Sequence, residues 1–214
     1  MIKKIAIFQK KERYTMEQNL TFADLGLSAE VLQALEQKGY GYPTKIQAEA
    51  IPPFMEWKDV IAKAPTGTGK TFAFGIPMIE HIDAESEDLQ GLILAPTREL
   101  AIQIGESFAA YGRFAGLRHT VIFGGVGQKP QTEALERGID ILIATPGRLL
   151  DLIGQGFIHL DTLEYFVLDE VDRMLDMGFI HDIRRILKLL PAKRQTLFFS
   201  ATMPPEIETL ANSM

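Results

Sequence analysis

Cysteine is absent from the 214 residues of this chain. The absence excludes a disulfide framework and any zinc site built on thiolates. Histidine is also scarce, and the four histidines are scattered without the spacing of metal ligands: His81, His119, His159 and His181. The sequence therefore indicates neither a small disulfide-stapled domain nor a zinc protein.

Long apolar runs are missing as well. No segment approaches the about 18 consecutive apolar residues that a membrane helix needs. The apolar stretch within residues 1–8 is too short for a signal peptide, and no small-residue cleavage site follows it. We therefore expect a monomer in the cytoplasm with no membrane partner.

Positive charge is in deficit, with 22 Lys and Arg against 28 Asp and Glu and a net charge of −6. This balance argues against binding nucleic acid through bulk positive charge, although a local patch could still bind it. Residues 1–15 reverse the balance, with five basic side chains and one acidic one. We expect residues 1–19 to be an N-terminal extension, either flexible or a short ordered element, with Met16 as an alternative start.

Short apolar runs rich in β-branched residues alternate with helical patterns, which predicts an α/β fold with a mostly parallel sheet covered by helices on both faces. The chain is interpreted as one domain over residues 20–214. The expected strands are Val60–Ala64, Leu92–Ala95, Thr120–Phe123, Ile139–Ala144, Phe166–Asp169 and Thr196–Ser200. The expected helices are Ser28–Lys38, Lys45–Met55, Thr71–Ile82, Glu99–Tyr111, Thr132–Arg137, Arg148–Ile153, Ile180–Leu190 and Pro205–Ala211.

The segment APTGTGKT, residues 64–71, follows an expected strand and opens an expected helix. This is the context of a phosphate-binding P-loop, in which glycines let backbone N–H groups surround an anion at a helix N-terminus. Lys70 would neutralise the β- and γ-phosphates, and the Thr71 hydroxyl would bind Mg²⁺. Ala64 stands where the general pattern has Gly. The segment predicts a nucleoside triphosphate ligand with Mg²⁺.

An apolar strand ends in two adjacent carboxylates, Asp169 and Glu170. Successive side chains of a strand point in different directions, so one carboxylate can serve the metal and the other the attacking water. On its own this would be an exposed acidic strand end. Together with the P-loop it predicts a nucleotide hydrolase.

Three more segments occupy the C-terminal end of an expected parallel strand, where ligands of open α/β sheets gather. They begin at Pro96, Thr145 and Ser200, and a glycine pair at Gly124 follows another strand. Threonine and arginine at a strand-to-helix turn can hold a phosphate. One nucleotide cannot use all of these anion sites, so we expect a nucleic-acid strand bound through its backbone with weak sequence specificity.

The ordered set of segments resembles the N-terminal RecA-like lobe of DEAD-box RNA helicases over about residues 20–214. Residues 41–47 resemble the Q motif, with Phe22 as its upstream aromatic residue. The other segments are similar to motifs I, Ia, GG, Ib, II and III of that family: residues 64–71, 96–101, 124–125, 145–148, 169–172 and 200–202. The resemblance implies a RecA-like P-loop NTPase domain that binds ATP, Mg²⁺ and RNA.

The resemblance also implies residue roles. Glu170 would orient or deprotonate water, Asp169 would serve the metal, and Lys70 would contact phosphate. The implied nucleotide-binding residues are Phe22, Tyr42, Thr44, Gln47, Thr66, Gly67, Thr68, Gly69, Lys70 and Thr71, with Gln47 reading adenine and Phe22 stacking on it. Asp172, Ser200 and Thr202 would couple the nucleotide site to lobe closure. The implied RNA-binding residues are Pro96, Thr97, Arg98, Gly124, Gly125, Thr145, Pro146, Gly147 and Arg148.

Two departures from the family are visible. Val171 stands where the family has Ala, and the 214 residues stop just after motif III, without the second lobe that bears the arginine fingers. We therefore expect this chain to bind adenine nucleotide with little turnover, and the longer protein to open RNA duplexes with ATP. The alternatives are a DNA translocase of the same superfamily, a nucleotide kinase and a non-catalytic binding module.

Overall fold

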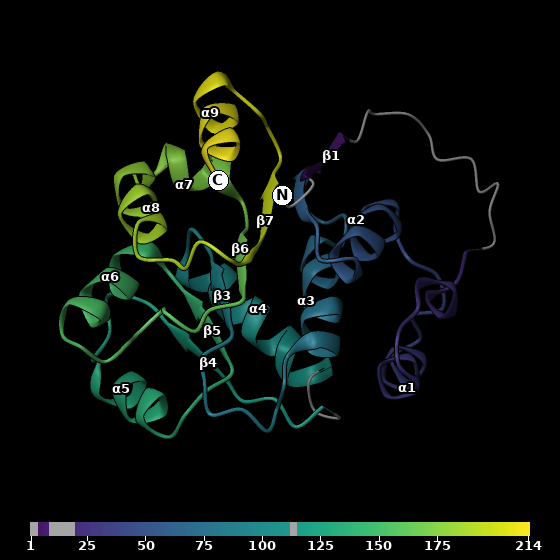
Figure 1. Cartoon of the computed structure of the whole chain (residues 1–214), viewed down its shortest axis with the longest axis horizontal. Helices are drawn as coiled ribbons and strands as arrows, with labels where there is room; N and C mark the ends of the chain where they lie inside the picture. Colours follow the sequence, from purple (N-terminus) through teal and green to yellow (C-terminus); the bar gives the residue numbers. More distant parts are fainter. Residues whose placement is uncertain (1–3, 9–19, 112–114) are drawn as a thin grey trace.

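The computed structural model describes residues 4–8, 20–111 and 115–214. Its strands form one seven-stranded sheet in which every neighbouring pair is parallel, in the order β1-β2-β7-β6-β3-β5-β4 (Figure 1). The strands are β1 (Lys4–Phe8), β2 (Asp59–Lys63), β3 (Gly91–Leu94), β4 (His119–Ile122), β5 (Ile141–Ala144), β6 (Tyr165–Leu168) and β7 (Gln195–Ser200). Within the described ranges the expectation of a mostly parallel sheet is therefore confirmed.

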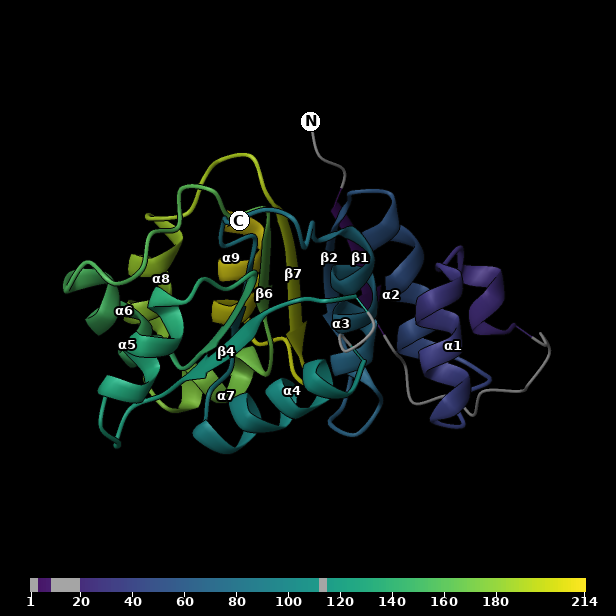
Figure 2. The same cartoon turned by 90° about the horizontal axis from the view of Figure 1, so that it is seen from below.

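Helices cover both faces of the sheet (Figures 1 and 2). One face carries α1 (Ala29–Gln37), α2 (Lys45–Met55), α3 (Lys70–His81) and α4 (Arg98–Tyr111), with a 3₁₀ turn at Phe22–Leu25 before them. The other face carries α5 (Lys129–Glu136), α6 (Pro146–Gly154), α7 (Val171–Asp176), α8 (Ile180–Leu187) and α9 (Pro205–Ser213). In the part of the chain that the structure describes, no helix is long and apolar enough to cross a membrane.

The apolar strands supply two separate hydrophobic cores. In β5, Ile141 and Ile143 pack into the core beneath α2 to α4, whereas Leu142 and Ala144 pack into the core beneath α6 to α9. Side chains of a strand alternate between the two faces, so a strand buried on both sides needs apolar residues throughout. This requirement explains the unbroken apolar runs in the sequence.

The ranges of β1, the 3₁₀ turn and α7 were not predicted, although a short ordered element within residues 1–19 was one of two expectations. β1 lies within the expected N-terminal extension and pairs with β2, while the rest of the extension lies outside the described residues. α7 contains six residues, of which Val171 and Met174 are buried. Two apolar positions are too few to reveal a helical pattern in the sequence. The boundary of the domain at residue 20 stays a prediction.

The parallel arrangement brings the loops that follow β2, β3, β5, β6 and β7 to one edge of the sheet (Figure 2). Lys63, the last residue of β2, pairs with Ser200, the last residue of β7. Asp169 continues the ladder, since its N–H donates to the carbonyl of Leu94. The predicted site segments are therefore neighbours in space.

Candidate nucleotide and nucleic-acid site

The P-loop connects β2 to α3 through backbone conformations that favour glycine. Gly67 has φ 77° and Gly69 has φ 92°, both in the left-handed region. The Thr68 hydroxyl donates to the carbonyl of Pro65 at 2.8 Å and closes the turn. Gly69 is the N-cap of α3, so the loop ends at a helix N-terminus, as an anion site requires.

Lys70 is the buried cation of the site. Its side chain is 5% exposed, and Nζ lies 3.8 Å from Asp169 Oδ1 without a hydrogen-bond partner. A buried ammonium without hydrogen bonds is costly, so this atom is suited to an anionic ligand. Burial raises the pKa of Asp169 to about 6, and the Lys70 charge opposes this rise.

Glu170 adopts a strained backbone conformation between β6 and α7. Its φ is 51°, which is uncommon for a residue other than glycine and is often found at functional sites. The Glu170 N–H donates to Asp169 Oδ1 at 2.9 Å, and Glu170 Oε2 lies 3.4 Å from Arg173 Nη1. The tight turn thus places two carboxylates at one strand end, as predicted from the sequence.

Asp172 links motif II to the end of β7. Its Oδ2 accepts from the Thr202 N–H at 2.8 Å and from the Thr202 hydroxyl at 3.0 Å, and its own N–H donates to Ser200 Oγ at 3.2 Å. Burial raises the pKa of Asp172, but the hydrogen bonds outweigh burial and leave the pKa below its ordinary value. The predicted trio of Asp172, Ser200 and Thr202 is therefore in contact.

Gln47 joins the N-terminus of α2 to the P-loop. Its Oε1 accepts from the Thr44 N–H at 2.9 Å, and its Nε2 donates to the carbonyl of Gly69 at 3.2 Å. A Cβ added to Gly69 would lie 2.4 Å from Gln47 Nε2. The two segments are thus in direct contact, and the amide orientation is fixed by one donor and one acceptor.

The remaining segments lie along the same edge but differ in exposure. Gly124, Gly125 and Gly147 are exposed, and Arg98 is exposed with its guanidinium 5.0 Å from the centre of the Phe123 ring. Thr97 and Thr145 are half-buried. Pro96 and Pro146 are buried, so their burial does not support the predicted RNA contacts, and they act by shaping the turns.

Arg148 is engaged by the protein itself. Its side chain is 11% exposed, Nη2 donates to the carbonyl of Val126 at 3.0 Å, and Nε lies 3.6 Å from Asp151 Oδ2. The guanidinium therefore ties the glycine-pair loop to the start of α6. In this conformation little of it is open to RNA.

The chain was then compared with known proteins. Residues 44–210 match the DEAD/DEAH box helicase family. The chain belongs to this family. The ATP-dependent RNA helicase CshA of Limosilactobacillus reuteri is 48% identical over 191 residues, which cover 89% of this chain and 38% of that protein. The RNA helicase CrhR of Synechocystis is 48% identical over 192 residues, which cover 90% and 39%.

A solved structure agrees with these matches. A DEAD box protein from Methanococcus jannaschii superimposes with a TM-score of 0.86 at 42% identity, covering 90% of this chain and 53% of that one. The fold is therefore the RecA-like fold of this helicase family. The chain spans about two fifths of the length of the curated relatives named above.

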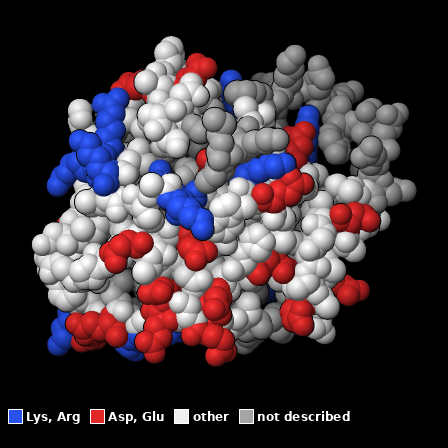
Figure 3. All heavy atoms as spheres, in the orientation of Figure 1, with Lys and Arg blue, Asp and Glu red and all other residues white. Residues whose placement is uncertain are grey.

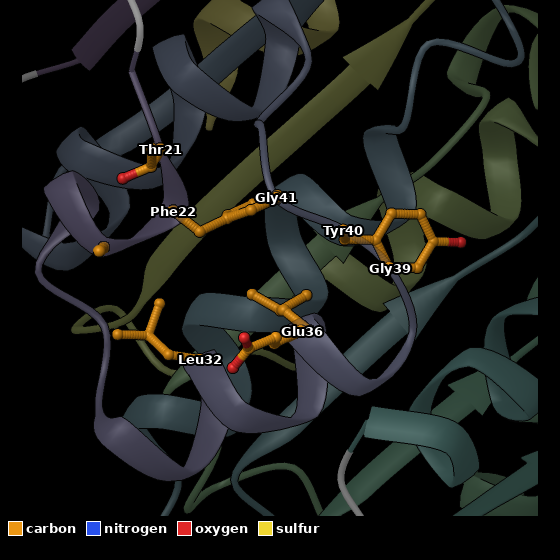
Figure 4. A pocket seen from close by; sticks show the side chains of 9 residues that line it. Thr21, Phe22, Leu32, Glu36, Gly39, Tyr40 and Gly41 are labelled. Atoms are coloured by element: carbon orange, nitrogen blue, oxygen red, sulfur yellow. The ribbon is translucent and has the colours of Figure 1, made fainter.

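Phe22, which was expected to stack on adenine, is 3% exposed in this chain. It lines a cavity of about 390 Å³ between the 3₁₀ turn, α1 and residues 39–41, which contains neither Gln47 nor a P-loop residue (Figure 4). Stacking by Phe22 stays a prediction. Tyr42 is 71% exposed, whereas Tyr40 packs against Phe72 with ring centres 5.1 Å apart.

Tyr40 was missed by the sequence analysis. It lies at the edge of the cavity, and its partner Phe72 directly follows Thr71 of the P-loop. Two tyrosines flank Gly41, and the family resemblance pointed to Tyr42. The ring contact links Tyr40 to the first turn of α3, and nucleotide binding by Tyr42 stays a prediction.

Proposed function

We propose that this chain is the ATP- and RNA-binding lobe of a DEAD-box RNA helicase. Lys70 provides the main support, because its ammonium is buried and faces a strand-end carboxylate without a hydrogen bond. The phosphates of ATP would supply the missing acceptors. The names of the relatives, which describe RNA helicases, support the choice of RNA.

Each group of site residues would have its own role in ATP binding and hydrolysis. The P-loop N–H groups and Lys70 would hold the β- and γ-phosphates, and Gln47, already fixed by two backbone contacts, would present its amide to adenine. Glu170, at its strained turn, would orient the attacking water or accept its proton. Asp172 would transmit the state of this site to β7 through Ser200 and Thr202.

Magnesium would be held jointly by protein and nucleotide. In the described ranges, no group of three or more His, Asp or Glu side chains gathers into a metal cage. This fits Mg²⁺, which is usually bound by one or two protein ligands together with substrate phosphates. Thr71 and Asp169 would be those ligands, partly through water, and the ion would neutralise charge that develops on the phosphates.

Turnover by these 214 residues alone is expected to be low. In phosphoryl transfer, an arginine finger contributes about 10³–10⁵ in rate. The family resemblance places that arginine in a second lobe, which is not among these residues. The longer protein, in the cytoplasm, would couple closure of two lobes on ATP to bending of one RNA strand and local duplex opening.

Nucleotide binding can be tested on the chain itself. A fluorescent ATP analogue with Mg²⁺ should bind, and ATP should compete with it better than GTP. Lys70→Ala should abolish binding, whereas Arg137→Ala, at an exposed residue remote from the P-loop, should not change it. Equal competition by ATP and GTP, or undiminished binding by Lys70→Ala, would contradict the assignment.

The same preparation separates the alternatives. RNA-stimulated ATP hydrolysis by the chain alone would contradict the expected low turnover, and tighter binding to DNA than to RNA would favour a translocase. In a full-length version, Glu170→Gln should abolish ATP hydrolysis. A nucleotide kinase would have no use for the exposed glycines and Arg98 along the sheet edge.

A further inference from the structure

A basic surface lies over α8 and the loop that leads to β7, outside the site described above. Between residues 181 and 194 the chain carries five Lys or Arg and only one Asp, although its net charge is −6. Figure 3 shows blue atoms gathered over α8, while red atoms predominate in the lower half of the same view. We define the α8 patch by four exposed residues: Arg184, Arg185, Lys188 and Lys193.

The structure of α8 explains how the patch forms. Ile180, Ile183 and Ile186 are buried beneath the helix, so the side chains between them face solvent. Arg184 and Lys188 are four residues apart and therefore lie on one side of the helix, with Cβ atoms about 5–6 Å apart. Lys193 follows in the loop before β7. The cations thus project together from one surface.

Most of these charges have no acidic partner. Within the described residues, the side chains of Arg184, Lys188 and Lys193 make no ion pair or hydrogen bond, and of the four patch residues only Arg185 approaches an acid, with Nη1 3.7 Å from Asp182 Oδ1. Several cations elsewhere in the described ranges are paired, including Lys129 with Glu133 and Arg118 with Asp140. The patch is therefore a concentration of free positive charge.

We propose that the α8 patch binds the phosphate backbone of RNA segments that extend beyond the sheet edge at which the P-loop and the predicted RNA residues lie. This inference rests on the proposed function. The patch lies at the N-terminal ends of the strands, opposite the P-loop edge, so it is separate from the predicted RNA residues (Figure 2). At the P-loop edge, the Arg148 guanidinium already contacts the carbonyl of Val126 and the carboxylate of Asp151, so few free cations remain there.

The chemistry of the patch favours phosphate over bases. None of its members is aromatic, so the patch offers no ring on which bases could stack, and unpaired Lys and Arg bind phosphates through release of counterions. Leu189 is the one large apolar side chain exposed beside the cations, at 47%. One exposed leucine gives little apolar area for a protein partner, so the chemistry fits an RNA backbone.

The test compares two double variants of the whole chain. Arg184→Gln with Lys188→Gln removes two of the four positive charges of the patch, and Lys38→Gln with Arg137→Gln removes the same charge from exposed positions elsewhere. Binding of a fluorescein-labelled RNA hairpin with a single-stranded tail is measured by anisotropy between about 50 and 200 mM salt. The patch variant should lower the slope of log K against log salt by about 2, and the control should leave it unchanged.

Each other outcome is decisive. If both variants change the slope equally, or if neither does, the patch is not an RNA surface. Polyglutamate, which stands in for an acidic protein, is added as a competitor of the labelled RNA. If the patch variant still binds RNA but polyglutamate no longer competes with it, the surface is one for an acidic protein and the RNA assignment is wrong. Binding of the fluorescent ATP analogue, measured in parallel, should be equal in all three proteins. If the unmodified chain does not bind the ATP analogue, that result would instead contradict the proposed function.

Discussion

Gln47→Glu tests the contact between α2 and the P-loop with almost no change in shape. In the structure the amide oxygen accepts from Thr44 and the amide nitrogen donates to Gly69. Glutamate can keep the first bond, but it would turn a carboxylate oxygen toward the Gly69 carbonyl, replacing a hydrogen bond by repulsion. Gln47 is 6% exposed, so solvent screens this repulsion poorly.

The size of the effect follows from these contacts. Loss of the bond and burial of an unsatisfied acceptor cost about 1–3 kcal/mol. A negative charge in the first turn of α2 restores about 0.3–1 kcal/mol. We therefore expect the free energy of unfolding to fall by about 1 kcal/mol in a urea titration, and Tm to fall by about 2–4 °C.

Gln33→Glu provides the matched control, because Gln33 is exposed in the middle of α1, away from both helix ends, and the same chemical change there should alter stability little. A Gln47→Glu variant as stable as the unmodified chain would refute the reasoning. It would mean that Gln47 does not donate to Gly69, and that the amide is free to turn before nucleotide binds.

Three further predictions concern neighbouring residues. Gly69→Ala should lower the free energy of unfolding by about 2 kcal/mol, because an L side chain at φ 92° is strained; unchanged urea stability would contradict this. Thr202→Val removes a hydroxyl that donates to Asp172. Because the pKa of Asp172 is depressed in the folded chain, this carboxylate stabilises the fold above its ordinary pKa, and the stabilisation is lost in acid. This variant should be less stable by about 1 kcal/mol at neutral pH and equal in stability to the unmodified chain at low pH; a deficit that persists in acid would exclude the carboxylate as its source. Lys70→Met should raise the pKa of Asp169 further above about 6, because a nearby positive charge is lost; a carboxyl NMR titration that finds the pKa unchanged or lower would show that the two groups do not interact.

The local conformation of the P-loop and of the strand end at motif II could be predicted from the sequence because it depends on local patterns. A glycine-rich turn after an apolar strand specifies its own conformation, and Gly67 and Gly69 indeed adopt positive φ. The distance between Lys70 and Asp169 could not be predicted. It depends on the order β2-β7-β6, which places strands far apart in the sequence side by side.

The partners of some side chains, unlike those of Asp172, were likewise beyond the sequence. Arg148 was expected to hold RNA, yet its guanidinium contacts the carbonyl of Val126, a residue in another loop. The packing of Tyr40 against Phe72 was not predicted either, since only Tyr42 had been singled out. Such choices are made by tertiary packing, because several polar groups along one sheet edge compete for the same donors and acceptors.

The pairing of β1 with β2 has a consequence for how this protein behaves in concentrated solution. β2 leads directly into the P-loop, and β1 covers its outer edge over five residue pairs. Without that cover, β2 would present a row of open backbone donors and acceptors to other molecules, as the edge strands of aggregating proteins do. The five-residue strand at the start of the chain thus occupies the backbone edge of β2 and keeps the strand that leads into the P-loop from pairing with another molecule.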